Sequence, residues 1–140
     1  MQGKVKSGIG DLARWMIKLR DLYASKLGRE MYPGSLNIEL DDPLDFPQDD
    51  IRIEPGEGAN TVGVSITGCV INGHRAFALR TDNNECGTGD HPKTILEVIS
   101  EVRLRDYLDL KDGDTVEIDL NYTSEAGLII CSENNQPAGR

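Results

Sequence analysis

The fold of this chain is best predicted outward from one stretch, residues 32–40, which reads YPGSLNIEL. Pro33-Gly34 makes a tight turn, because proline presets φ and glycine supplies the positive φ that a type II turn needs next. After the turn, apolar and polar residues alternate, as in a strand with two different faces. The apolar face carries Leu36, Ile38 and Leu40, and the polar face carries Ser35, Asn37 and Glu39.

The polar face of this expected strand has two interpretations. A hydroxyl, an amide oxygen and a carboxylate at two-residue spacing can hold a hard cation such as Mg²⁺, which prefers oxygen ligands. The alternative is an ordinary half-buried strand whose polar face is solvated. On this segment alone the second interpretation is the simpler one, and the rest of the chain has to decide between them.

The composition is that of a globular protein. The chain has 140 residues, 38% of them hydrophobic and 28% charged, and its three cysteines show no metal-like spacing. No apolar run approaches the length of a membrane span, and the N-terminus lacks the apolar core of a signal peptide. We therefore expect a cytoplasmic, monomeric protein with reduced thiols and one domain, residues 1–140. Residues 121–140 are expected to be a C-terminal extension ending in a partly disordered tail.

The charge balance limits the classes of partner that the protein is expected to bind. A net charge of −9 repels nucleic acid and anionic lipid, so we expect neither a nucleic acid nor a membrane as partner. Two local groups of basic residues, at 14–20 and at 103–105, leave a nucleotide substrate open. The acidic residues concentrate at 41–50, a proline-interrupted loop, and at 106–119. The loop lacks the EF-hand pattern, so a solvated crossover is preferred there to a calcium site.

The N-terminal region predicts a strand, a glycine turn and a helix. Residues 3–7 form the expected strand, and Gly8-Ile9-Gly10 forms the turn. Apolar residues then recur at three- and four-residue intervals up to Leu27, with Asp11 as the expected N-cap and Gly28 as the C-cap. Free amides at a helix start can bind phosphate, although many helices simply begin after such a turn, and the spacing matches neither the dinucleotide nor the Walker motif.

The remainder of the chain predicts short strands. They are expected at 51–53, 61–71, 74–79, 95–99 and 115–120, with one further candidate at 128–131. Asn72-Gly73 is a strong hairpin signal between the second and third of these. Residues 81–90 are expected to be a loop and residues 103–108 a short helical turn. Glu97 lies inside an apolar run, either on a wet strand face or directed into a site. This pattern predicts a mainly β, small closed or nearly closed barrel with one main helix near the N-terminus.

Four segments, taken together, resemble one family. They are residues 3–10, residues 32–40, residues 91–99, and residues 104–106 followed by the LKDGD sequence at 110–114. In this order they resemble the CTP-dependent riboflavin kinases of archaea, over residues 3–120. The resemblance implies a six-stranded cradle-loop barrel that transfers the γ-phosphate of CTP to riboflavin, giving FMN and CDP, with Mg²⁺.

The resemblance also implies roles for individual residues. Metal binding is implied for Ser35 and Asn37, flavin contacts for Thr88 and Glu97, and catalytic roles for Asn37 and Glu97. Glu97 would orient the acceptor hydroxyl or accept its proton. Nucleotide binding is implied for two segments: Ile9, Gly10, Asp11, Leu12, Ala13 and Arg14, and Arg103, Leu104, Arg105 and Asp106.

The chain departs from the family pattern at several positions. Ser35 replaces the usual threonine and keeps the hydroxyl ligand, whereas Leu12 stands where a further glycine is common. One extra residue separates Thr88 from His91, and Glu101 stands where proline is typical. The long 81–90 loop leaves the acceptor substrate open.

Other classes of function are compatible with parts of the sequence. The turn at 110–114 also occurs in swapped-hairpin DNA-binding regulators of related barrel type, which would need a basic face that this acidic chain lacks. A flavin- or nucleotide-binding module without catalysis, and a kinase acting on another small alcohol, both remain open. The sequence does not decide between CTP and ATP as donor.

Overall fold

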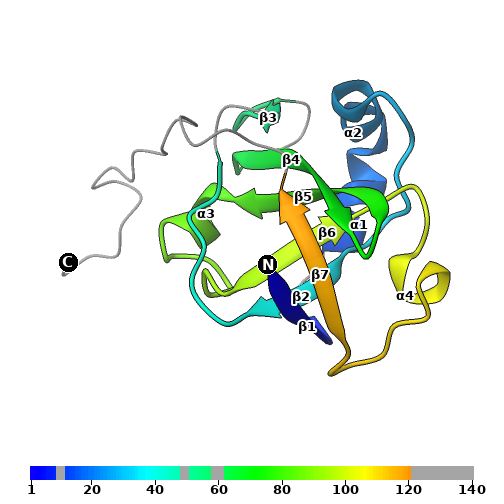
Figure 1. Ribbon diagram of the computed structural model, residues 1–140. Helices are drawn as coiled ribbons and strands as arrows, with labels where there is room; N and C mark the ends of the chain where they lie inside the picture. The colour runs from blue at the N-terminus through cyan, green and yellow to red at the C-terminus, as the bar shows by residue number, and fades with distance from the viewer. Residues whose placement is uncertain (9–11, 48–50, 58–61, 121–140) are drawn as a thin grey trace.

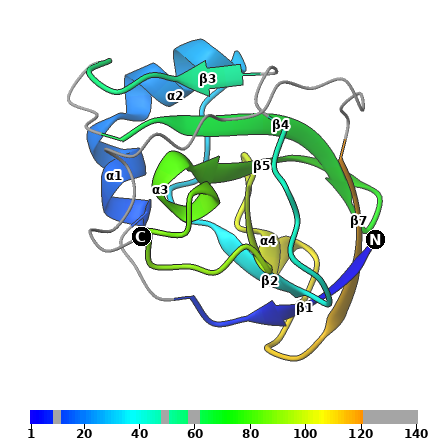
Figure 2. The ribbon, with the colours of Figure 1, turned by 90° about the vertical axis from the view of Figure 1, so that its left-hand side faces the viewer.

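The protein folds as a closed antiparallel barrel. The structure, a computed structural model, describes residues 1–8, 12–47, 51–57 and 62–120. The barrel strands are β1 (Gln2–Lys6), β2 (Leu36–Leu40), β4 (Val64–Ile71), β5 (His74–Thr81), β6 (Ile95–Ile99) and β7 (Thr115–Leu120). They pair in the order β4-β5-β6-β2-β1-β7, and β7 pairs back with β4 (Figures 1 and 2). The expected six-stranded barrel is confirmed.

One edge of strand β4 pairs with two different strands. The first residues of β4, Val64–Ile66, pair with the short strand β3 (Ile51–Ile53), and its last residues pair with β7. The hairpin between β4 and β5 turns at Asn72 and Gly73, whose φ angles of 46° and 82° suit an Asn-Gly turn. The hairpin expected from this dipeptide is therefore confirmed.

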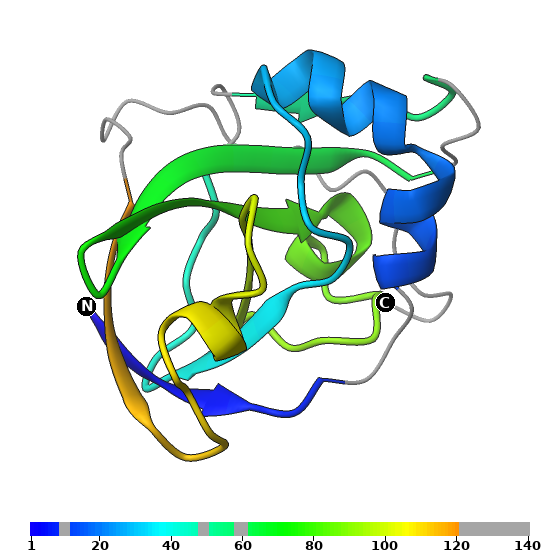
Figure 3. The ribbon, with the colours of Figure 1, turned by 90° about the vertical axis from the view of Figure 1, so that its right-hand side faces the viewer.

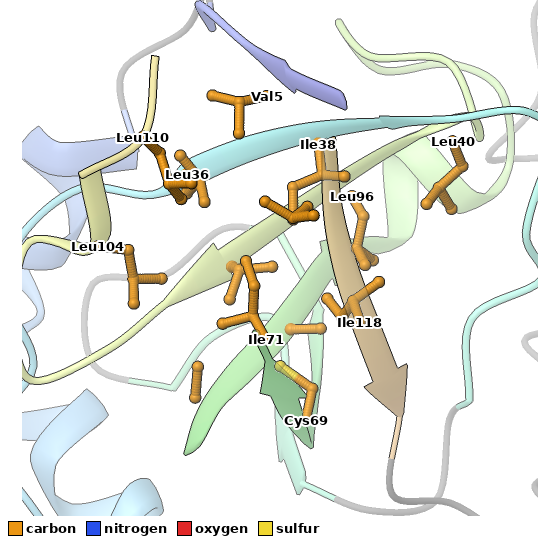
Figure 4. Packing of buried hydrophobic residues seen from close by; sticks show 14 of the residues in the cluster. Val5, Leu36, Ile38, Leu40, Cys69, Ile71, Leu96, Leu104, Leu110 and Ile118 are labelled. Carbon is orange, nitrogen blue, oxygen red and sulfur yellow. The ribbon is translucent and has the colours of Figure 1, made fainter. Parts of the chain in front are cut away.

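The barrel interior is filled by alternate residues of its strands. Successive strand residues point to opposite faces, so the apolar face of β2 lies inside. Ile38 meets Leu96 of β6 and Ile118 of β7 in this core, and none of the three side chains has exposed surface (Figure 4). The interior is therefore a packed core, and any ligand site has to lie outside it.

Two helices cover the outer face of the barrel wall. These are α1 (Leu12–Lys18) and α2 (Arg20–Leu27), which meet at an angle in Figure 3. Met16 and Tyr23 pack against Ile66, Leu79 and Ile99 on the outward face of β4, β5 and β6. This second apolar cluster attaches the helical pair to the barrel.

The N-terminal helix was expected to be continuous, and it is not. The α-helix is interrupted at Leu19, where φ is −107° and ψ is 27°. The amide of Leu19 still donates to the Trp15 carbonyl (2.8 Å), and the amide of Tyr23 donates to the Leu19 carbonyl (3.0 Å). Because these bonds continue across the break, the chain changes direction around the barrel without losing its apolar face. Gly28 ends α2 in the left-handed conformation, as expected.

Other differences concern loops and cysteines. The expected loop at 81–90 begins with the short helix α3 (Asp82–Glu85), and α4 (Leu104–Tyr107) is the expected helical turn. Cys69 is a buried free thiol, whereas Cys86 is disulfide-bonded, so the expectation of reduced thiols is wrong for Cys86.

Three predictions lie outside the described residues: the N-cap at Asp11, the candidate strand at 128–131 and the extension at 121–140. Within the described part, none of the helices has the length and apolarity to cross a membrane.

A buried arginine fixes the loops at one end of the barrel. Arg80 of β5 is 3% exposed, and its guanidinium donates to the Glu85 carboxylate at 2.8 Å. It also donates to the carbonyl oxygens of Leu44, Lys93 (3.0 Å) and Ile95 (3.3 Å). One side chain thereby joins the segment after β2, the helix α3 and the segment before β6.

We predict that Arg80→Ala destabilises the fold by about 3–5 kcal/mol, because it removes a buried cation that pairs with the Glu85 carboxylate and donates to three carbonyl groups. The free energy of unfolding in urea measures this effect. The exposed Arg75 on the same strand supplies the control, and Arg75→Ala should change stability by about 0.5 kcal/mol or less. Equal values for the two variants would contradict the structural role of Arg80.

Candidate active site

The β2–β6 pairing brings two polar side chains together on the outer face of the barrel. Asn37 of β2 lies directly opposite Glu97 of β6 in the strand register. Both are buried, with 8% and 9% of their surface exposed. Ser35, which directly precedes β2, donates a hydrogen bond from Oγ to Glu97 Oε1 at 3.0 Å. Three of the sequence-predicted site residues therefore form one cluster.

The polar face of β2 is therefore solvated at one end and buried at the other. Glu39 is exposed and pairs with Lys6 at 3.2 Å, as a solvated strand face would. Asn37, two residues earlier, is enclosed. The amide oxygen Oδ1 of Asn37 is buried and has no hydrogen-bond partner, the single such side-chain atom among the described residues. A buried oxygen without a donor is costly, and it is the kind of group that a bound cation satisfies.

The backbone at Gly8 covers the amide group of Asn37. A Cβ atom at position 8 would lie 1.5 Å from Asn37 Nδ2 and 2.7 Å from Cγ. An added side chain would overlap the Asn37 amide unless Asn37 moved, so glycine permits the close approach at this position. The segment that follows β1 thus packs directly on the polar cluster.

A cavity of about 380 Å³ opens in front of this cluster. The volume is within the range typical of small-molecule sites, about 300–1,000 Å³. Its apolar wall comes from the helical pair and from β4 and the residues before it, and comprises Leu12, Trp15, Leu19, Tyr23, Val62 and Val64. Its polar wall comprises Ser35, Asn37, Thr81, Asn84, Asp90, His91 and Glu97. A small molecule that combines apolar surface with polar groups suits such a cavity.

The electrostatics of the cavity depend on burial. Burial raises the pKa of the Glu97 carboxyl above its ordinary value, while His91 and the Ser35 hydrogen bond act in the opposite direction. Burial, and then the charge of Glu97, raise the pKa of Tyr23 to about 12. Glu97 is therefore a stronger proton acceptor than an exposed glutamate, and Tyr23 stays protonated at neutral pH.

A second cavity, of about 230 Å³, adjoins the first. It lies between the turn at 32–36 and the segment at 98–105 that contains the start of α4. Gly34 and Ser35 line both cavities. The turn that introduces β2 therefore stands where two binding spaces meet.

The predicted nucleotide-binding residues divide between the two cavities. Leu12 and Ala13 line the larger cavity, and Arg103, Leu104 and Arg105 line the smaller one. Arg14 is exposed on α1 and lines neither. Asp106 is also exposed and pairs with Arg103 at 2.7 Å. Ile9, Gly10 and Asp11 lie outside the described residues.

Thr88 lies apart from the cluster. Its side chain is exposed, its Oγ1 donates to the Asn83 carbonyl at 3.2 Å, and it lines neither cavity. The neighbouring residues that do reach the larger cavity are Asn84, Asp90 and His91. Asn84 is buried, and its Oδ1 accepts a hydrogen bond from the His91 amide at 3.2 Å. The flavin contact of Thr88 stays a prediction.

Sequence reasoning missed part of the cavity wall. Trp15 and Tyr23 follow the apolar period of the helices, and no local signal separates a core aromatic residue from one that borders a cavity. Asn84 lies in a polar stretch with no pattern to distinguish it. The amphipathic period predicts which face of a helix is covered, and it does not predict how completely.

Two oxygen atoms of the polar cluster are of the kind that a magnesium ion binds. The described part of the chain contains no group of three or more His, Cys, Asp or Glu residues placed to hold a metal. Mg²⁺ instead keeps several waters and takes one or two protein oxygens together with substrate phosphates. The hydroxyl of Ser35 and the unpartnered Oδ1 of Asn37 fit that requirement.

These features define a class: a small antiparallel barrel protein with two adjoining cavities that meet at a polar cluster. Comparison with known proteins is more specific. A family model described as the CTP-dependent riboflavin kinase domain, also called domain of unknown function DUF120, matches residues 5–120. The chain belongs to the CTP-dependent riboflavin kinase family.

Several curated relatives carry the name riboflavin kinase. The protein from Methanocella arvoryzae is 33% identical over 126 residues, which covers 86% of this chain and 56% of the relative. The protein from Thermofilum pendens is 37% identical over 134 residues, covering 84% and 57%. That from Methanothermobacter thermautotrophicus is 35% identical over 130 residues, covering 86% and 98%. The chain thus spans little more than half the length of some relatives and nearly all of another.

We predict that Gly8→Ala destabilises the protein by about 1–3 kcal/mol, because the added methyl group overlaps the Asn37 side chain. In an Asn37→Ala background the overlapping atoms are absent, and most of this cost should disappear. Unfolding midpoints of the two single variants and the double variant measure the coupling. The same cost in both backgrounds would show that Gly8 does not pack on Asn37.

Proposed function

We propose that this protein is a CTP-dependent riboflavin kinase that transfers the γ-phosphoryl group of CTP to riboflavin, giving FMN and CDP. The observation that carries the proposal is the cluster of Ser35, Asn37 and Glu97 at the junction of two cavities. Family membership supports the same reaction. A transfer reaction needs a donor and an acceptor held side by side, and this arrangement supplies two spaces with polar groups between them.

The smaller cavity is assigned to the donor nucleotide. It is lined by Arg103, Leu104 and Arg105, which the family resemblance implicates in nucleotide binding. From there the phosphates would extend past Gly34 and Ser35 toward Gly8 and the start of α1. Arginine side chains and free helix amides favour anionic groups along this path.

The larger cavity is assigned to riboflavin. Trp15 and Tyr23 offer aromatic surface for a flat ring system, and Asn84 and His91 offer polar contacts at its edge. Glu97 lies at the inner end of the same cavity, beside the junction. In this arrangement the hydroxyl of the ribityl chain reaches the polar cluster while the ring occupies the apolar part.

Ser35 and Asn37 are the residues that would hold Mg²⁺. When bound, the ion would neutralise charge on the phosphate oxygens. The protein's own residues account for the remaining requirements. Asn37 is fixed by strand pairing and by the Gly8 backbone, so its oxygen needs no reorganisation. The apolar wall excludes water from the acceptor, which limits hydrolysis of the donor.

Glu97 is assigned to the proton of the acceptor hydroxyl. The hydroxyl oxygen forms a bond to the γ-phosphorus as the bond to the bridging β–γ oxygen breaks, and CDP departs. The hydroxyl proton passes to the Glu97 carboxylate and then to solvent. Its raised pKa makes this carboxylate a better acceptor, and Ser35 holds its Oε1 in place.

We predict that the purified protein forms FMN from riboflavin with CTP and Mg²⁺ at least about tenfold faster than with ATP, a difference of about 1.4 kcal/mol. Chromatography of the flavin products measures both rates. Equal rates with all four nucleotides would overturn the donor assignment alone. Absence of FMN with every nucleotide would overturn the kinase assignment, and phosphorylation of another alcohol would redefine the acceptor.

We predict that Glu97→Gln lowers kcat by about tenfold to a hundredfold, because glutamine keeps the size of the side chain and cannot accept the proton. Glu101→Gln is the matched control, since Glu101 lies four residues further on, is exposed and pairs with Arg29. It should leave kcat within about twofold of the original value. An unchanged kcat in folded Glu97→Gln would remove Glu97 from proton transfer.

A further inference from the structure

The LKDGD sequence at 110–114 has no role in the site described so far. It forms the turn between α4 and β7, in which Gly113 has a φ of 91°. The Lys111 amide donates to Asp114 Oδ2 at 2.8 Å and closes the turn. Two backbone bonds dock the turn on β1: Gly113 N–H to the Val5 carbonyl (2.7 Å) and Val5 N–H to the Asp114 carbonyl (2.8 Å). These backbone bonds hold the turn against the first strand.

The side chain of Asp112 makes two further contacts from this turn. Ser7 Oγ donates to Asp112 Oδ2, and Arg105 Nη2 donates to Asp112 Oδ1 at 2.5 Å. The hydrogen bonds from Ser7 and then Arg105 hold the pKa of the Asp112 carboxyl below its usual range, so it is ionised at neutral pH. One carboxylate thus joins residues that lie almost a hundred positions apart in the sequence.

The two partners of Asp112 belong to the walls of different cavities. Ser7 precedes Gly8, which lines the larger cavity and packs on Asn37. Arg105 lines the smaller cavity. Asp112 itself lines neither cavity. Its side chain connects the Ser7–Gly8 segment with Arg105 and faces neither cavity.

These contacts do not hold the fold together. The side chain of Asp112 is 54% exposed and that of Arg105 27% exposed, and exposed ion pairs contribute little to stability. The backbone bonds already fix the turn. What the Asp112 side chain adds is geometry, since it restricts the Arg105 guanidinium and the Ser7 hydroxyl to one relative arrangement.

We propose that Asp112 is a positioning residue for nucleotide binding, which holds the Ser7–Gly8 segment and the Arg105 guanidinium at the spacing that a nucleoside triphosphate requires. The inference rests on the proposed function, since it assigns the donor to these two walls. A nucleotide that contacts both walls gains from their fixed spacing, whereas a ligand of the larger cavity alone does not. Loss of Asp112 should therefore weaken one substrate and spare the other.

The test compares Asp112→Asn with Asp109→Asn in the full chain. Asp109 lies in the same loop, is exposed and has a φ of 52°, which asparagine tolerates, so the control makes the same charge change. Calorimetry measures the Kd of CTP with Mg²⁺, and flavin fluorescence measures the Kd of riboflavin. Asp112→Asn should raise the Kd and KM of CTP about five- to tenfold, as loss of a charged hydrogen bond does. Riboflavin Kd, kcat and the control variant should stay within about twofold, and Tm within about 2 °C.

The possible outcomes separate this proposal from the proposed function. An original protein that binds CTP and makes FMN, together with an Asp112→Asn variant of unchanged CTP affinity, overturns the positioning role alone. Parallel weakening of CTP and riboflavin with a lowered Tm also overturns it, because that pattern indicates a structural role. An original protein that binds no nucleotide overturns both proposals.

Discussion

The antiparallel pairing of β2 with β6 is the constraint on which the site depends. Ile38 pairs with Leu96 and Leu36 with Val98, and all four side chains face the barrel interior. With this register the intervening pair, Asn37 and Glu97, has to face outward. A slip of one residue would turn every side chain of the strand to the opposite face, which would expose the core and bury the polar pair inside it. The apolar core thus specifies the site geometry without touching a ligand.

The helical pair converts that outward face into an enclosed site. α1 and α2 cover the wall formed by β4, β5 and β6 through Met16, Tyr23 and Leu27, and they leave a space in front of β2. Complete packing there would bury more apolar surface and close the cavity. The buried amide oxygen of Asn37 is a second departure from maximal stability. Both departures occur at the same place, as expected where binding and not folding decides the residues.

Local chemistry made much of this fold predictable from the sequence. The alternation at Leu36, Ile38 and Leu40 predicted the strand and its buried face, the Asn72-Gly73 dipeptide predicted the hairpin, and Gly28 predicted a helix end. Each of these signals acts over a few neighbouring residues, so no distant contact has to be known. The polar residues Asn37 and Glu97 were also identified, although their pairing was not, because strand register depends on the whole closed barrel.

Other features depended on distant contacts and were not predictable. Nothing in the 3.6-residue period marks Leu19 as the break between two helices, since its apolar side chain continues the buried face. No local pattern marks Arg80 as buried, because its burial depends on carbonyl and carboxylate groups from three separate segments. The same limit applies to Trp15 and Tyr23. They border a cavity because other parts of the chain leave space beside them, and local sequence does not show this.

The charge of the protein poses a problem for any triphosphate ligand, and the second cavity shows how local structure can solve it. The net charge of −9 opposes an anion at long range, but salt screens such a field within about 10 Å. At short range the two arginines of the cavity differ. Arg103 is 49% exposed and pairs with Asp106 three residues away, whereas Arg105 is 27% exposed and pairs with Asp112 from another segment. A guanidinium has five N–H donors, so pairing with one carboxylate oxygen leaves others for a ligand. Because Arg105 is both less screened and oriented from outside its own helix, it is the arginine better prepared to bind an anion in an acidic protein.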